Sequence, residues 1–215
     1  MARVQVHADD IELDSPVLVE GLPGTGLVGK ITADTLVEQF DMSLYGSLYC
    51  EGLPDVAVYH GERSEVLPPV RLYADGTRDL LILQSDVPVS PSGAPAFADC
   101  VTDWFEDNDV FPLYLSGLPE EKNGVPELYG VATGEATTAL DAVGLVVQTD
   151  PQFPDPEAAR VVLEGGVGPI ADVEVDTDAL VEQADEIQSA REELARQLQD
   201  AGDESTQAQP IRGFQ

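Results

Sequence analysis

Basic residues are scarce in this chain. Its 215 residues include 10 Lys and Arg, with Lys30 and Lys122 the only lysines, against 41 Asp and Glu, so the formal net charge is −31. Such a surface repels phosphate groups, which excludes nucleic-acid binding driven by counterion release and disfavours anionic membrane surfaces. The acids are spread along the whole chain, which indicates adaptation to molar salt, where self-repulsion is screened.

Cysteine and long apolar runs are also few or absent. The two cysteines, Cys50 and Cys100, form no C-x-x-C pair, so we expect neither a disulfide framework nor a cysteine-rich zinc site. The first ten residues contain no apolar signal region, and no run of about 18 apolar residues occurs. The 43% of hydrophobic residues suffices for a core, and the length suits one domain. We therefore expect a soluble, cytoplasmic protein.

Apolar, β-branched runs bounded by Gly and Pro recur along the chain and predict strands. They cover Pro16–Val19, Leu44–Cys50, Val56–Tyr59, Val70–Tyr73, Leu80–Gln84, Pro112–Leu115, Leu128–Ala132 and Val143–Thr149. Helical patterns lie between them, after Gly26, over Phe97–Phe105 and from Pro156 to about Leu163. This alternation predicts an α/β fold, a three-layer α/β/α sandwich with a mostly parallel sheet.

The composition divides the chain into three parts. We expect an α/β domain over residues 1–175, an amphipathic C-terminal helix over 176–200 and a flexible tail over 201–215. The polar tail ends in Ile211, Arg212, Gly213, Phe214 and Gln215.

The expected C-terminal helix has a narrow apolar stripe. Leu180, Ile187 and Leu194 recur every seven residues, and Asp176 or Thr177 is the expected N-cap. The stripe packs either along the parent domain or against another subunit, because three heptads are near the minimum for a coiled coil.

Three Gly-Leu-Pro triplets begin at Gly21, Gly52 and Gly117, each after a predicted strand. Gly tolerates positive φ and Pro blocks a sheet ladder, so we expect each triplet to end its strand. Parallel strands leave a sheet at one edge, which predicts that these turns share a rim where ligands of open α/β sheets bind. Ordinary turn chemistry is the simpler explanation.

The loop GLPGTGLVGK, which ends at Lys30, follows a strand and opens a helix. Gly24, Gly26 and Gly29 match the dinucleotide pattern G-x-G-x-x-G, and the same stretch matches the phosphate-loop pattern G-x-x-x-x-G-K. A phosphate loop continues with Ser or Thr to ligate magnesium, whereas Ile31 follows here. A nucleoside triphosphatase is therefore not expected.

Two interpretations of this loop remain. For dinucleotide binding, Glu51 lies 22 residues beyond Gly29, where a ribose-binding acid belongs, but Pro23 removes an amide donor beside the first glycine. In the interpretation that we favour, the glycines let the helix and strand backbones approach closely. The predicted structural loop then comprises Gly21, Pro23, Gly24, Gly26 and Gly29.

Catalytic signatures are missing. G-x-S-x-G and H-E-x-x-H do not occur, and only His7 and His60 are histidines. Cys50 and His60 form a conceivable nucleophile and base, but a buried structural cysteine and a turn histidine are the simpler expectation. We predict no catalytic residue, no metal ligand and no cofactor.

Five segments share one resemblance, namely VLVEGLPGTGLVGK, ITADTLVEQF, LYGSLYCEGLPDVAVY, DPQFPDPEAARVVLE and DTDALVEQADEIQ. Together they resemble the archaeal proteasome assembly chaperone family, of the second-chaperone type, over most of residues 10–200. The resemblance implies a fold similar to nucleoside phosphorylases without an established catalytic site, a homo-oligomer, and a role in helping proteasome α-subunits to assemble. With the acidic composition, it suggests a haloarchaeal source.

The chain departs from the resemblance at one connection. About ten residues separate the strand ending at Ala132 from the strand starting near Val143, fewer than a parallel crossover needs. The resemblance implies a further glycine-rich loop and helix there, which we expect this chain to have lost.

The tail supplies a separate argument. Proteasome activators and some archaeal assembly chaperones insert a C-terminal motif of a hydrophobic residue, Tyr and any residue between α-subunits. The corresponding residues here are Gly213, Phe214 and Gln215, which keep the penultimate aromatic and lack its hydroxyl. An aromatic at the end of a polar tether cannot easily reach a core, so we expect residues 211–215 to bind a partner.

These observations predict a non-enzymatic proteasome assembly chaperone that binds proteasome α-subunits and itself, and neither nucleic acid nor membranes. The alternative is a nucleotide- or nucleoside-binding enzyme or sensor that uses residues 21–30.

The charge leads to a first prediction. Lowering KCl from molar concentration to about 0.1 M lengthens the Debye length from about 3 Å to about 10 Å, so repulsion among 31 net negative charges should loosen the fold or its oligomer. We expect a lower melting temperature or a changed hydrodynamic radius at low salt. Unchanged values of both across this range would refute adaptation to molar salt.

Overall fold

The computed structural model describes residues 3–8, 10–54, 56–59, 66–120, 124–132 and 142–187. Its strands are β1 (Arg3–Val6), β2 (Val17–Gly21), β3 (Ser43–Tyr49), β4 (Val58–Tyr59), β5 (Val66–Leu67), β6 (Val70–Asp75), β7 (Leu80–Ser85), β8 (Phe111–Pro119), β9 (Leu128–Ala132) and β10 (Val143–Thr149). Every strand expected from the sequence is present, and β1 and β5 are additional.

Eight strands form one sheet in the order β1-β3-β6-β7-β2-β8-β10-β9, and β4 pairs with β5 separately. The expectation of a mostly parallel sheet is wrong. Only the neighbours β7-β2, β2-β8 and β8-β10 are parallel, and the other four pairings are antiparallel. One physical reason is the short turn between Asp75 and Leu80, which has room for a hairpin and none for a crossover.

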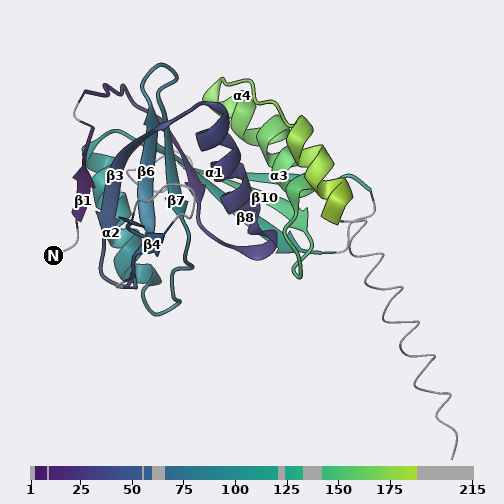
Figure 1. Ribbon diagram of the computed structural model, residues 1–215, viewed down its shortest axis with the longest axis horizontal. Helices are drawn as coiled ribbons and strands as arrows, with labels where there is room; N and C mark the ends of the chain where they lie inside the picture. Colours follow the sequence, from purple (N-terminus) through teal and green to yellow (C-terminus); the bar gives the residue numbers. More distant parts are fainter. Residues whose placement is uncertain are drawn as a thin grey trace, which may run out of the picture.

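Helices cover both faces of the sheet, as the expected three layers require (Figure 1). One layer contains η1 (Thr25–Leu27), α1 (Val28–Gln39), α3 (Pro156–Val162), the wide helical turn η2 (Leu163–Val167) and α4 (Gly168–Ala171). The opposite layer contains α2 (Ala94–Asp107), which lies behind the sheet in Figure 1.

The sheet has a hydrophobic core on each face, because successive side chains of a strand point to opposite faces. In β7, Ile82 packs toward α1 and α3, whereas Leu81 and Leu83 pack toward Phe97 and Phe105 of α2. These side chains are almost completely buried, because a strand between two helical layers needs apolar residues at every position. The apolar run LLIL is therefore explained by the layering.

Strand β9 pairs antiparallel with β10, with Ala132 opposite Val143. The short connection between them therefore joins neighbouring antiparallel strands and needs no crossover helix. Our argument that the connection is too short assumed parallel strands and was wrong on that point. Residues 133–141 lie outside the described residues.

The C-terminal helix begins at Asp178 and is described to residue 187. The Thr177 carbonyl accepts the first helical hydrogen bonds, from the amides of Leu180 and Val181, so Thr177 occupies the N-cap. Leu180 is buried in the core beside α1 and α3. The apolar stripe thus begins by packing on the parent domain. No helix of the described residues is long and apolar enough to span a membrane.

The two cysteines form one disulfide, which the sequence did not predict. Cys50, just after β3, is bonded to Cys100 in α2, with their Cα atoms 6.0 Å apart. The two cysteines are 50 residues apart in the chain, and only the packing of α2 across β3 brings them together. The bond also removes the conceivable pairing of a Cys50 thiol with His60, a residue outside the described ones.

The disulfide leads to a second prediction. Closing a loop of this length lowers the entropy of the unfolded chain, so its loss should reduce the free energy of unfolding by up to about 4 kcal/mol. We expect this loss in the double variant Cys50→Ala, Cys100→Ala, measured by denaturant unfolding. Reductant should destabilise the wild type and leave the double variant unchanged. An unfolding midpoint of the wild type that ignores reductant would contradict the prediction.

Candidate functional site

The carboxyl ends of β2, β3, β7, β8 and β10 lie at one edge of the sheet, as their pairing directions require. Gly21 ends β2 and Gly52 follows β3 at this carboxyl rim. Gly117 lies inside β8 opposite Val147 of β10, and the strand ends at Pro119, so this triplet forms the end of its strand and does not follow it. The triplets nevertheless share one rim, as predicted.

The glycine loop enters α1 through two residues in left-handed conformation, Gly26 with φ 66° and Leu27 with φ 53°. A side chain at Gly26 would overlap the Thr149 side chain, and one at Gly21 would overlap Ala33 of α1. Gly29 lies against the carbonyls of Leu22 and Glu20. These contacts favour the interpretation that the glycines allow close packing of helix and strand.

Asp155 holds the loop against the segment that follows β10. Its amide donates to the Gly26 carbonyl at 2.9 Å, and its buried carboxylate accepts from the Thr149 hydroxyl at 2.9 Å and from the Ala158 amide at 3.1 Å. This carboxylate caps α3. A buried negative charge beside the glycine loop would also repel a phosphate group.

The remaining loop positions contribute less. A side chain at Gly24 would meet nothing within 4 Å. Pro23 lies between β2 and η1, where it has no amide to offer a ligand. Residues 211–215 lie outside the described residues.

Glu51 is too distant to serve the loop. Strands β6 and β7 separate β3, which precedes Glu51, from β2, which precedes the glycine loop. Three strand spacings correspond to roughly 14 Å, whereas a ribose-binding acid normally follows the strand next to the glycine loop. The expected position of Glu51 for dinucleotide binding is therefore wrong.

A polar network lies beside α1 at the same rim. The buried Arg71 guanidinium contacts Asp86 at 2.6 Å and donates to the side chain of Gln84 at 2.8 Å. Lys30 contacts Asp34 at 2.6 Å and Asp86 at 3.5 Å. The two cations are thus matched by two carboxylates, which leaves no excess positive charge here to attract an anion.

Glu20 of β2 is a buried carboxylic acid that sequence reasoning missed. Its two oxygens accept from the backbone amides of Leu22 at 2.8 Å and Leu115 at 3.2 Å. Burial raises the pKa of Glu20 to about 7, against the lowering effect of these hydrogen bonds. Burial and the charge of Glu20 raise the pKa of the neighbouring Tyr114. A single acid inside the apolar strand VLVEG was the available signal.

A groove of about 430 Å³ separates the C-terminal helix from the start of α3. Val181, Ala184 and Ile187 line it on one side, and Asp150 and Asp155 line it on the other. The chain therefore reaches residue 187 close to the carboxyl rim. Within the described residues, no cluster of His, Cys, Asp or Glu is arranged to hold a metal ion.

The sequence profile of the PAC2 family matches residues 18–140 and 134–195. The chain belongs to the PAC2 family. This confirms the resemblance to archaeal proteasome assembly chaperones of the second type. The PAC2 chain is also 26% identical to an uncharacterized protein of Methanocaldococcus jannaschii, over 89% of this chain and 90% of the relative.

Solved structures share the fold of this PAC2 chain. Pyrococcus furiosus PbaA, described as an archaeal homolog of proteasome-assembly chaperone, matches with a TM-score of 0.73 and 20% identity, over 95% of this chain and 96% of that chain. Pyrococcus furiosus PbaB, described as an archaeal proteasome activator, matches with a TM-score of 0.72 and 20% identity, over 90% and 98%. The prediction that the chain is not an enzyme agrees with its membership of the PAC2 family.

The buried acid of this PAC2 protein leads to a third prediction. Because the pKa of Glu20 is raised from 4.5 to about 7, the folded state keeps a proton that the unfolded chain releases. The stabilisation is complete below about pH 4.5 and is lost as the pH rises through about 7, by up to about 3 kcal/mol. Glu20→Gln should remove this component, so the variant should gain stability relative to wild type between pH 4.5 and 8.

The test is denaturant unfolding at a series of pH values and constant KCl. Glu38→Gln, the same chemical change at an exposed position of α1, controls for the loss of one carboxyl group. Replacing one carboxyl oxygen by an amide nitrogen also changes the free energy of unfolding by an amount that does not depend on pH. This amount shifts the whole curve and leaves its pH dependence unchanged. Parallel curves of stability against pH for wild type and Glu20→Gln would show that the carboxyl does not titrate in this way.

Proposed function

We propose that the protein is a non-enzymatic proteasome assembly chaperone that binds proteasome α-subunits and acts as a homo-oligomer. Membership of the PAC2 family carries this proposal, because the match extends over nearly the whole α/β domain and the C-terminal helix. PbaA and PbaB, which share the fold over 90% or more of this chain, are described by proteasome-related roles.

The carboxyl rim supports a protein-binding role over a small-molecule one. In related α/β folds this rim binds ligands, but here Thr149 and Asp155 fill the space beside Gly26. Each buried charge at the rim serves a backbone group or an opposite charge of the same chain. Among the described residues, the rim thus offers a substrate neither an unmatched cation nor a metal site.

We further propose that Phe214 anchors the α-subunit. The described C-terminal helix reaches the carboxyl rim at residue 187, and 28 residues follow it. With the expected helix continuing to residue 200 and residues 201–215 extended, this segment spans at most roughly 70 Å, which is enough to reach a partner docked on the rim. Burying an aromatic side chain contributes about 1.5 to 3 kcal/mol, or about tenfold or more in affinity.

The fourth prediction tests this anchor. We expect Phe214→Ala, and deletion of Ile211 to Gln215, to weaken α-subunit binding at least about tenfold while leaving the melting temperature unchanged. Gln209→Ala, a truncation of a polar side chain in the same tail, should bind like wild type. Phe214→Tyr should bind at least as well as wild type, since it restores the hydroxyl of the docking motif.

Affinities are measured for the full chain in molar KCl, after capture of α-subunits from a salt-rich lysate. Equal affinities for wild type, Phe214→Ala and Phe214→Tyr would exclude the tail as the anchor and leave the rim or the C-terminal helix as the binding surface. Failure of the wild-type protein to capture any α-subunit would instead overturn the proposed function itself.

A further inference from the structure

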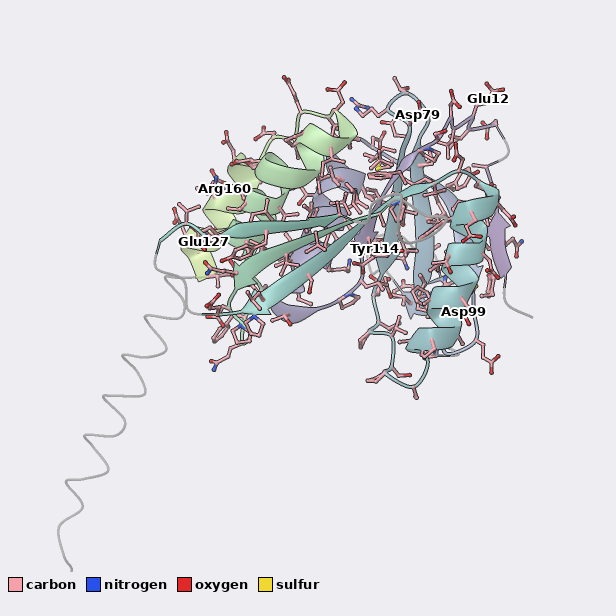
Figure 2. The ribbon with its side chains drawn as sticks, turned by 180° about the vertical axis from the view of Figure 1, so that it is seen from behind. Glu12, Asp79, Asp99, Tyr114, Glu127 and Arg160 are labelled. Carbon is pink, nitrogen blue, oxygen red and sulfur yellow. A yellow bond between two sulfur atoms is a disulfide. The ribbon has the colours of Figure 1, made fainter. Side chains whose placement is uncertain are left out.

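Among the described residues, no helix covers one side of half of the sheet. Leu113 and Leu115 of β8 and Leu145 and Val147 of β10 pack toward the core beneath α1 and α3. The residues between them point to the opposite face, where α2 covers only the other half of the sheet. Figure 2 shows this side: α2, marked by Asp99, lies over one half, and no described helix crosses the strands near Tyr114 and Glu127.

The uncovered surface consists of uncharged residues. We call it the open face and define it by the outward positions of three strands: Tyr114, Ser116 and Leu118 of β8, Gly144, Val146 and Gln148 of β10, and Tyr129 and Val131 of β9. None of these residues is charged, in a chain of which 24% is charged. Tyr129 is 43% exposed and Val131 is 63% exposed.

Two carboxylates border the open face at one end and hydrogen-bond to its side chains. Glu120 accepts from the side chain of Gln148 at 3.1 Å, and Glu127 accepts from the Tyr129 hydroxyl at 2.5 Å, both at the carboxyl-end border. Glu20, next to Tyr114 on the neighbouring strand β2, is buried and turned to the backbone. Exposed apolar area without charge, bordered by polar groups, is typical of a protein–protein interface.

The charge of the chain decides which partner fits. A basic partner would be attracted to acidic side chains, and the open face offers only Glu120 and Glu127 at one border, each already hydrogen-bonded to a side chain of the face. A second copy carries the same net charge of −31, so it can approach closely only where neither surface presents a carboxylate. In a two-fold interface the same patch meets itself, and an uncharged patch avoids facing like charges.

The shape of the open face suits this occupant. Across the three strands, Tyr114, Gly144 and Val131 form one row, in which the glycine lies between two larger side chains. A Cβ added at Gly144 would meet only ordinary contacts with Val131, so the fold does not require glycine there. A hollow between two ridges can receive a side chain of an opposing sheet, as when two sheets pack about 10 Å apart.

We infer that two copies of this chain associate face to face through the open face of β8, β10 and β9. This inference specifies the self-association included in the proposed function, and its test needs no α-subunit. Three strands about 4.8 Å apart and five residues long present roughly 240 Å² in projection, which is less than the ~800 Å² per partner of a standard interface. The open face is thus the apolar centre of the contact, and association depends on concentration and on salt that screens the surrounding acids.

The fifth prediction is tested by sedimentation velocity of the full chain in molar KCl over a range of concentrations. We expect wild type to exceed the 22.9 kDa mass of one chain as concentration rises. Val131→Glu and Tyr129→Glu should raise the dissociation constant more than about a hundredfold, because each variant buries two carboxylates, one from each copy, in a contact that is otherwise apolar. Gly144→Leu should weaken association without adding charge, by filling the hollow.

Val66→Glu is the matched control. Val66 is a strand valine 65% exposed, close to the 63% of Val131, and it lies on β5 outside the open face. It should associate like wild type. A wild type that stays monomeric at every concentration, or equal association of the Val131→Glu and Val66→Glu variants, would overturn the inference. The inference would also be overturned if the open-face variants associate like wild type in sedimentation but lose α-subunit binding. The open face would then bind the proteasome subunit.

Discussion

The close approach of α1 to β2 is the contact on which the rest of the structure depends. Gly21 has no room for a side chain because Ala33 of α1 lies directly against it, and Gly29 brings the first turn of α1 onto the carbonyls of β2. Helix α1 also contacts α3, β7 and β8, so its depth on the sheet sets the position of the whole layer. Val19 of β2 and Val28 and Leu36 of α1 are fully buried, so the close packing of α1 on β2 removes their apolar surface from water.

The same placement of α1 organises the polar groups around it. Lys30 and Asp34 on its exposed flank meet Asp86 and Gln84 at the end of β7, and Gln39 at its last turn accepts from the amide of Asp176. The C-terminal helix therefore starts from a point attached to α1. A side chain at Gly21 would displace α1 and disturb the polar network and the base of this helix together.

Two buried acids of this protein, Glu20 and Asp155, lie where strands end or diverge. Beyond Val19 and Leu113, β2 and β8 no longer pair, and the Glu20 carboxyl accepts the Leu115 amide that the ladder leaves unmatched. Asp155 serves the amides of Asp150 and Ala158 in the same way after β10. These acids satisfy backbone groups whose burial without partners would cost about 1 to 3 kcal/mol each. At the rim of this PAC2 protein, residues that resemble catalytic acids therefore stabilise the fold.

Local patterns in the sequence determined seven of the eight strands of the central sheet, all but β1, and also the helices α1, α2 and α3 and the start of the C-terminal helix. Apolar periodicity and Pro or Gly punctuation act within a few residues. The segments around the glycine loop were also sufficient to indicate the family. Tertiary structure alone decided the pairing of β3 with β1 and β6, the Cys50–Cys100 bond, the burial of Glu20 and the open face. Each of these depends on which distant segments become neighbours. Strand order is set by the packing of whole layers, and a period of two residues along one strand carries no information about its partner.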